Sequence, residues 1–189
     1  QWRAKPLTDE EVERFFAEQE NTGVTVSCAH DSYLINLGSP DEELYKKSFE
    51  AFMVELERCE ILKVPNLVMH PGSHVSSGEK VGLKRIANAF NMLFDKLPDN
   101  KTTVCLETTA GQGSNLGYKF EQLAEIIEMV EDKERIGICL DTCHIFAAGY
   151  PIQKEEEYKA TIKEFDRILG LVRLKVIHFN DSKKGLGSK

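Results

Sequence analysis

Short apolar segments alternate with longer segments of helical periodicity along the whole chain. The short segments, rich in β-branched residues, are 23–30, 65–70, 102–107, 135–141 and 174–179. The helical segments are 8–19, 41–62, 78–97, 119–132 and 155–171. Strands that are apolar throughout must be covered on both faces. The alternation therefore predicts a parallel sheet covered by helices, either an open doubly wound sheet or a closed (β/α) barrel.

The length of 189 residues predicts one domain, residues 1–189, because the chain is too short for two cores of ordinary size. With 24 basic and 31 acidic residues the net charge is −7, so a nucleic acid would have to be held by a local basic patch or by bound cations. The sequence shows neither an apolar leader nor a long apolar run, which predicts a cytoplasmic protein without a membrane partner. The cysteines lack zinc-knuckle spacing and suit a reducing compartment. They are Cys28, Cys59, Cys105, Cys139 and Cys143.

Each predicted strand ends in a side chain that can bind a metal ion. These residues are His30, His70, Glu107, Asp141 and His178. A single histidine or carboxylate at such a position is commonly a hydrogen-bonded structural residue. Five together are different, because the carboxyl ends of parallel strands meet at one rim and parallel α/β folds build their active sites there. We therefore expect these five side chains to converge.

The remaining two histidines lie close to the same positions. His144 follows Asp141 by three residues in the stretch GICLDTCHIFAAGY, and His74 lies in the loop after His70. All histidines of the chain are thus predicted to lie at or near one rim.

Side chains two positions before each strand end point in the same direction as the proposed ligands. They are Cys28, Val68, Cys105, Cys139 and Val176. Small apolar or thiol side chains of this kind are typical of an interior barrel layer, about 6.6 Å below the ligands at about 3.3 Å per residue. We interpret these cysteines as packing residues that lie too deep to bind the same ions.

Imidazole and carboxylate ligands without thiolate suit Zn²⁺, Mn²⁺ or Fe²⁺. The number of candidate ligands exceeds what one ion requires. Several ions around a bridging carboxylate would activate water and stabilise both the attacking and the leaving oxygen of a phosphoester. The residues therefore favour phosphodiester hydrolysis, and bound cations would supply the positive charge that the chain lacks.

Successive blocks of the sequence resemble the signature blocks of the endonuclease IV family of apurinic/apyrimidinic endonucleases. They are AHDSYLINLGSP (29–40), HPGSH (70–74), LETTAGQGSNLG (106–117), LDTCHIFAAGY (140–150) and HFNDSK (178–183). The resemblance implies a (β/α)8 TIM barrel of the AP endonuclease/xylose isomerase-like type. It also implies three zinc ions and a role in base excision repair, in which duplex DNA is cut 5′ to an abasic site to leave a 3′-hydroxyl and a 5′-deoxyribose phosphate.

The same resemblance assigns metal ligands. His30 and His70 match ligands of one zinc, and Glu107 matches the catalytic carboxylate that bridges this zinc to a second. Asp141 and His178 match ligands of the second ion.

Three further positions follow from the matched blocks. His144 matches a ligand of the third zinc, which stabilises the leaving oxygen, and Tyr33 and Leu34 match residues that enter the DNA stack at the abasic gap. The segment GQGSNLG (111–117) has the wrong glycine spacing for a dinucleotide fingerprint, so we expect no nucleotide cofactor. Lys183 and Lys184 could contact a phosphate.

The resemblance covers about five of the eight barrel strands, which predicts a fragment without the family's remaining zinc ligands. The expected partner is double-stranded DNA with abasic sites, bound by a monomer associated with the nucleoid of a bacterium. Two alternatives stay open. One is a metal-dependent sugar isomerase of the related barrel type, which would need a lysine or histidine placed for proton transfer. The other is a catalytically incomplete fragment that binds metal or DNA.

Overall fold

The computed structural model describes residue 2 and residues 5–189. In this part of the chain the strands are β1 (Ala29–His30), β2 (Asn66–Met69), β3 (Thr103–Glu107), β4 (Ile136–Asp141) and β5 (Leu174–His178). The α-helices are α1 (Asp9–Thr22), α2 (Glu42–Ile61), α3 (Glu79–Lys96), α4 (Phe120–Met129), α5 (Thr142–Ala148) and α6 (Glu155–Leu169), and two short 3₁₀ helices precede β4 and β5, η1 (Lys133–Arg135) and η2 (Leu171–Arg173). The predicted alternation is confirmed.

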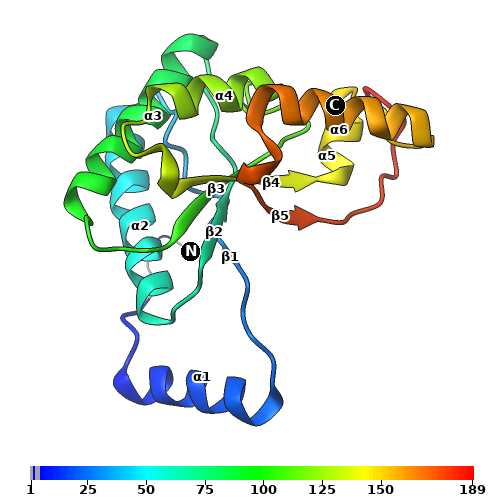
Figure 1. The fold of residues 1–189 in the computed structure, drawn as a ribbon. Helices are drawn as coiled ribbons and strands as arrows, with labels where there is room; N and C mark the ends of the chain where they lie inside the picture. The colour runs from blue at the N-terminus through cyan, green and yellow to red at the C-terminus, as the bar shows by residue number, and fades with distance from the viewer. Residues whose placement is uncertain (1, 3–4) are drawn as a thin grey trace.

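The five strands form one parallel sheet in the order β1-β2-β3-β4-β5. An open doubly wound sheet reverses its strand order at a switch point, whereas a barrel adds each strand beside the preceding one. The sequential order therefore selects the barrel, and the sheet is a curved part of its wall, with helices α2, α3, α4 and α6 on the outside (Figure 1).

The two faces of the sheet have different packing partners. On the outer face, Leu67, Val104, Leu106 and Ile138 are fully buried in the large core that the helices close. The inner face holds a separate small cluster, whose members are Val68, Cys105 and Cys139 with Cys28 and Val176 packed against them. The predicted interior layer of small side chains is thus confirmed. The same alternation places Glu107 on the inner face, beyond Cys105.

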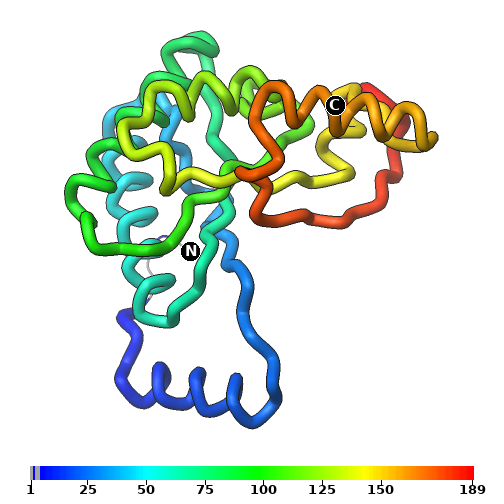
Figure 2. Tube along the Cα trace, viewed as in Figure 1, coloured from blue at the N-terminus to red at the C-terminus, as the bar shows by residue number. Residues whose placement is uncertain are grey.

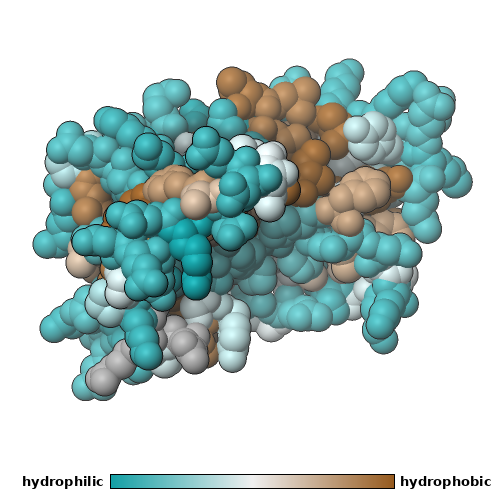
Figure 3. Space-filling view, turned by 90° about the horizontal axis from the view of Figure 1, so that it is seen from below, coloured by the Kyte–Doolittle hydropathy of each residue, from teal (hydrophilic) through white to brown (hydrophobic). Residues whose placement is uncertain are grey.

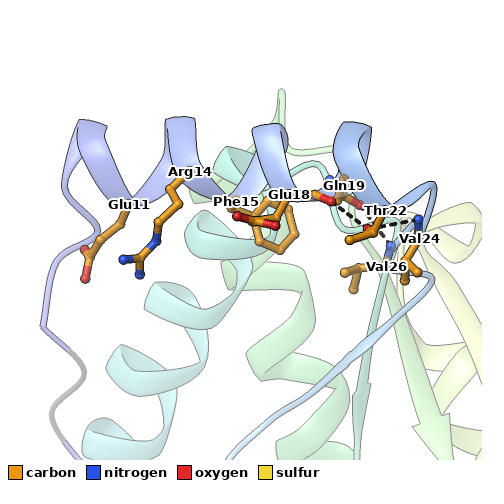
Figure 4. Close-up of a pocket in the computed structure, with 8 residues that line it drawn as sticks. All are labelled: Glu11, Arg14, Phe15, Glu18, Gln19, Thr22, Val24 and Val26. Carbon is orange, nitrogen blue, oxygen red and sulfur yellow. Dashed lines mark hydrogen bonds between the residues drawn. The ribbon is translucent and has the colours of Figure 1, made fainter.

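The first strand is much shorter than predicted, since pairing with β2 covers only Ala29 and His30. Side chains take the place of a strand partner for the residues before it. Gln19 accepts a hydrogen bond from the Val26 amide at 3.0 Å, and Asn66 donates one to the Ser27 carbonyl at 2.9 Å. The segment that leads from α1 to β1 runs extended (Figure 2), and its Val24 and Val26 line a pocket together with side chains of α1 (Figure 4).

Helix α5 was not predicted, because it follows β4 without a loop and has only seven residues. Asp141 is both the last residue of β4 and the N-cap of α5, with its Oδ1 accepting the His144 amide at 2.8 Å. Gly149 ends the helix at φ 111°, a conformation that favours glycine. This tight turn explains why an apolar run ends in Asp141 and His144: both side chains belong to the junction of a strand and a helix.

Among the described residues, no helix has both the length and the apolar character that crossing a bilayer requires. The face seen from below is mostly hydrophilic, with limited apolar areas (Figure 3).

The helix-facing core can be tested at Phe90, which is fully buried on α3 with its ring 6.2 Å from that of Phe52. We expect Phe90→Ala to lower the free energy of unfolding by about 3–5 kcal/mol, because the truncation leaves a cavity. Met92 on the same helix is 43% exposed, and Met92→Ala should change the free energy of unfolding by less than about 0.5 kcal/mol. Urea unfolding of both variants measures the difference, and equal losses would contradict the described core.

Candidate metal centre

A buried carboxylate lies at the centre of the rim. Glu107 is 1% exposed, and four histidines from four different segments point at it. Its Oε2 lies 2.9 Å from His30 Nε2 and 3.5 Å from His70 Nε2. Its Oε1 lies 3.1 Å from His144 Nδ1 and 3.2 Å from His178 Nδ1. One carboxylate group is therefore shared by both sides of the site.

Asp141 lies beside this cluster and is also buried, at 2% exposure. Its Oδ1 is 3.8 Å from His144 Nδ1 and its Oδ2 is 3.8 Å from His178 Nδ1. The five strand-end residues and His144 thus lie together, as the strand pattern predicts. His74 is different: its Nδ1 accepts the Gly78 amide at 3.2 Å in the loop after β2, so it has a structural contact of its own.

The charges of the cluster stabilise one another in the metal-free protein. Burial alone would raise the pKa of Glu107, but hydrogen bonds with His144, His30 and His70 outweigh burial and hold this pKa well below its usual range. Asp31 and Glu107 together raise the pKa of His30 to about 10 against the effect of burial. Glu107 likewise raises the pKa of His144. Glu107 is therefore ionised at neutral pH.

Three groups of side chains bring ligand atoms within 4.8 Å of one another. They are His30, His70 and Glu107; Glu107, Asp141 and His144; and Glu107, Cys139 and His178. Glu107 is common to all three. Three imidazoles or carboxylates around an open position are typical of catalytic sites for zinc and similar divalent ions. The donor set therefore fits a centre with more than one cation.

Cys139 lies closer to the candidate ligands than the sequence predicts. The interior cysteines were expected to lie too deep to reach the ligand atoms, yet Cys139 Sγ is within 4.8 Å of ligand atoms of Glu107 and His178. The reason is that Cys139 of β4 pairs with Glu107 of β3, so that its side chain lies level with this carboxylate and not a full layer below it. Cys139 is fully buried, and burial raises the pKa of its thiol well above the usual range. It stays a neutral thiol, so we interpret it as a packing residue.

Several residues that hold the ligands were not identified from the sequence. Asn180 Nδ2 donates to Asp141 Oδ2 at 2.6 Å, and Thr108 Oγ1 accepts the Asp141 amide at 2.9 Å. The Thr108 carbonyl accepts from His144 Nδ1 at 2.9 Å. On the other side, the Asp31 carbonyl accepts from His30 Nδ1 at 3.0 Å. These contacts orient the rings and carboxylates, and all three residues occur inside the motif blocks within two positions of a ligand.

The loop after β1 presents an aromatic side chain to solvent. Tyr33 is 85% exposed. Leu34, the second residue that matches the family's DNA-inserting pair, is only partly exposed. The difference arises because Leu34 directly precedes Ile35, which is buried and draws the chain back to the core.

The whole chain, residues 1–189, matches the family model described as Xylose isomerase-like TIM barrel. A protein of Chloroflexus aggregans named Probable endonuclease 4 is 52% identical over 189 residues, which are 100% of this chain and 66% of that protein. A Probable endonuclease 4 of a Geobacter species is 46% identical, with 67% of its length covered. The chain thus spans just under two thirds of the first of these relatives.

Two solved structures are similar to this chain. Endonuclease IV from Thermus thermophilus superimposes with a TM-score of 0.85 at 35% identity, over 100% of this chain and 65% of that one. A D-tagatose 3-epimerase-like protein superimposes with a TM-score of 0.75 at 19% identity, over 92% and 62% of the two chains. Because its sequence identity is only 19%, this second structure shows a similar fold and nothing about function.

The raised pKa of His30 makes the stability of the metal-free protein depend on pH. The folded-state pKa is about 10 against an ordinary value of 6.5. The stabilisation is therefore complete below pH 6.5 and is lost as the pH rises toward 10. We expect the free energy of unfolding, measured in urea with a chelator present, to fall over this range. The free energy of unfolding of the His30→Gln variant should fall less steeply with pH. Parallel curves for the two proteins would contradict the assignment of this pH dependence to His30.

The interpretation of Cys139 as a packing residue is testable by metal binding. We expect Cys139→Ala to bind Zn²⁺ with an affinity within about twofold of the unmodified chain, because burial opposes formation of the thiolate that would bind the ion. His178→Ala should weaken binding by at least about tenfold. Competition with a chromophoric chelator measures both affinities. A loss for Cys139→Ala as large as that for His178→Ala would show that the sulfur binds the ion.

Proposed function

The chain belongs to the endonuclease IV group of the xylose isomerase-like TIM barrel family, and from this membership we propose that it is a metal-dependent endonuclease of DNA repair. We propose further that it cuts double-stranded DNA 5′ to an abasic site, leaving a 3′-hydroxyl and a 5′-deoxyribose phosphate. The observation that carries the proposal is the buried carboxylate of Glu107 shared by four imidazoles. An action as a monomer in the cytoplasm belongs to the same proposal.

The proposed cofactor is zinc, with Mn²⁺ and Fe²⁺ as the other ions that suit these donors. His30 and His70 would hold one cation, Asp141 and His178 a second, and His144 a third, with Glu107 shared between the first two. When bound, such cations supply Lewis acidity that polarises a phosphodiester and lowers the pKa of water. They would also offset the net charge of −7, which otherwise repels a phosphate backbone.

The protein's own side chains have three tasks in this proposal. Glu107 holds a negative charge in a buried position, where an unpaired carboxylate would be costly, and this charge binds cations. Asp31 and Thr108 accept protons of the histidine rings and so fix which ring nitrogen is free to act as a ligand. Tyr33 projects from the rim and can stack in the gap that a missing base leaves.

Incision of a duplex with one synthetic abasic site, by the zinc-loaded chain, tests the proposal. The same duplex without the abasic site is the control for specificity, and turnover of an aldose tests the sugar isomerase alternative. We expect cutting only of the abasic duplex, directly 5′ to the site. No cutting, or equal cutting of both duplexes, would contradict the proposed activity.

Glu107→Gln tests the shared carboxylate. We expect this variant to lose bound metal as well as incision, the latter by about 10²–10³-fold or more, because a neutral amide cannot balance two divalent cations. Glu125 is exposed on α4, and Glu125→Gln should change neither the metal content nor the rate of incision. Elemental analysis beside the incision assay gives both readouts. Full metal content in Glu107→Gln would contradict the bridging role.

A further inference from the structure

The turn that carries Tyr33 is anchored directly behind its exposed tip. The Ile35 amide donates to the Ser32 carbonyl at 2.9 Å, which closes a turn with Tyr33 and Leu34 at its centre. Ile35 is 5% exposed and Leu37 is fully buried. An aromatic side chain that stands in solvent is therefore attached to a base that is fixed in the core.

Asn36 lies between these two buried anchors and joins this loop to the next one. Its Nδ2 donates to the Ser73 carbonyl at 3.0 Å, and its Oδ1 accepts the Ser73 amide at 2.9 Å and the Gly38 amide at 3.0 Å. Its own amide donates to Ser48 Oγ at 3.0 Å. One side chain thus pairs both backbone groups of Ser73. Gly72 gives it room, since a Cβ there would lie 2.6 Å from Asn36 Oδ1.

The connection continues from Ser73 to a third loop. Ser73 Oγ lies 2.7 Å from Ser114 Oγ, and the His74 amide donates to the Ser114 carbonyl at 3.1 Å. The Leu116 amide donates to the Gly72 carbonyl at 2.8 Å. The three loops follow β1, β2 and β3, whose ends provide His30, His70 and Glu107. The loops therefore form one hydrogen-bonded unit above the ligands.

We propose that Asn36 is a positioning residue for the DNA-facing loop. It holds Tyr33 at a fixed place relative to His30, His70 and Glu107. The aromatic ring can then contact the DNA while the phosphodiester to be cut lies at these three ligands. The inference rests on the proposed function, because it assigns the fixed loop to DNA. The physical advantage is that a loop ordered before binding loses less conformational entropy when the duplex arrives.

The test compares Asn36→Ala with Asn91→Ala in the full chain. Asn91 is a matched control, since its side chain also joins two segments, donating to the Met129 carbonyl at 3.2 Å and accepting the Glu131 amide at 2.9 Å away from the rim. We expect Asn36→Ala to weaken binding of an abasic duplex by about tenfold, the scale of one or two lost hydrogen bonds. KM should rise more than kcat falls. Asn91→Ala should affect stability alone.

The Tyr33→Ala background separates positioning from general stability. If Asn36 acts through Tyr33, removing the ring first should reduce the effect of Asn36→Ala on duplex binding to below about twofold. An undiminished effect in that background would overturn the inference, as would unchanged binding by Asn36→Ala.

Amide hydrogen exchange gives a readout that needs no DNA. Asn36→Ala should speed exchange of Gly38 and Ser73, whose amides lose their acceptor, and leave β2 protected. Slow exchange at both amides would show that the loop does not depend on Asn36. Fast exchange with unchanged duplex binding would overturn the DNA role while the proposed function stands. An unmodified chain that neither binds nor cuts the abasic duplex would defeat the proposed function itself, and the positioning role with it.

Discussion

The burial of one negative charge is the constraint on which the rest of this structure depends. Glu107 is almost inaccessible to solvent, and such a carboxylate is costly unless it is paired. Its partners are four imidazoles, each delivered by a different segment of the chain. Parallel strands side by side can deliver them, because all their carboxyl ends lie at one rim. The centre therefore needs the sheet, and the metal-free sheet gains stability from the mutual attraction of these groups.

Neighbouring layers keep this cluster in place. On the inner face, Cys105 and Cys139 fill the space beneath the ligands with small side chains that burial keeps neutral. At the rim, Asp141 ends a strand, caps a helix and faces two histidines, so one residue couples the backbone turn to the geometry of the site. Asn180 holds its other oxygen. A change of Asn180 should thus reach the ligand Asp141, although Asn180 itself need not touch a substrate.

Hydrogen bonds connect the loops at the rim to one another. Loops usually move more than the elements that they join, and binding residues commonly lie on them. Here the loops after the first three strands share hydrogen bonds through Asn36, Ser73 and Ser114. Tyr33 combines high exposure with an anchored base, which is the combination that the proposed stacking in duplex DNA requires.

The sequence by itself determined the alternation of strands and helices, the six candidate ligands and the small interior layer, because apolar periodicity and position at a strand end are local properties. It did not determine the choice between an open sheet and a barrel, which needed strand order. The short β1, helix α5 and the approach of Cys139 to the ligands also came from the tertiary structure. The length of β1 and the approach of Cys139 depend on pairing with distant strands, and α5 depends on the turn in which Asp141 ends β4 and caps the helix. Asn36 is the clearest case, since it joins two loops through contacts with Ser48 and Ser73, which lie 12 and 37 positions further along the chain.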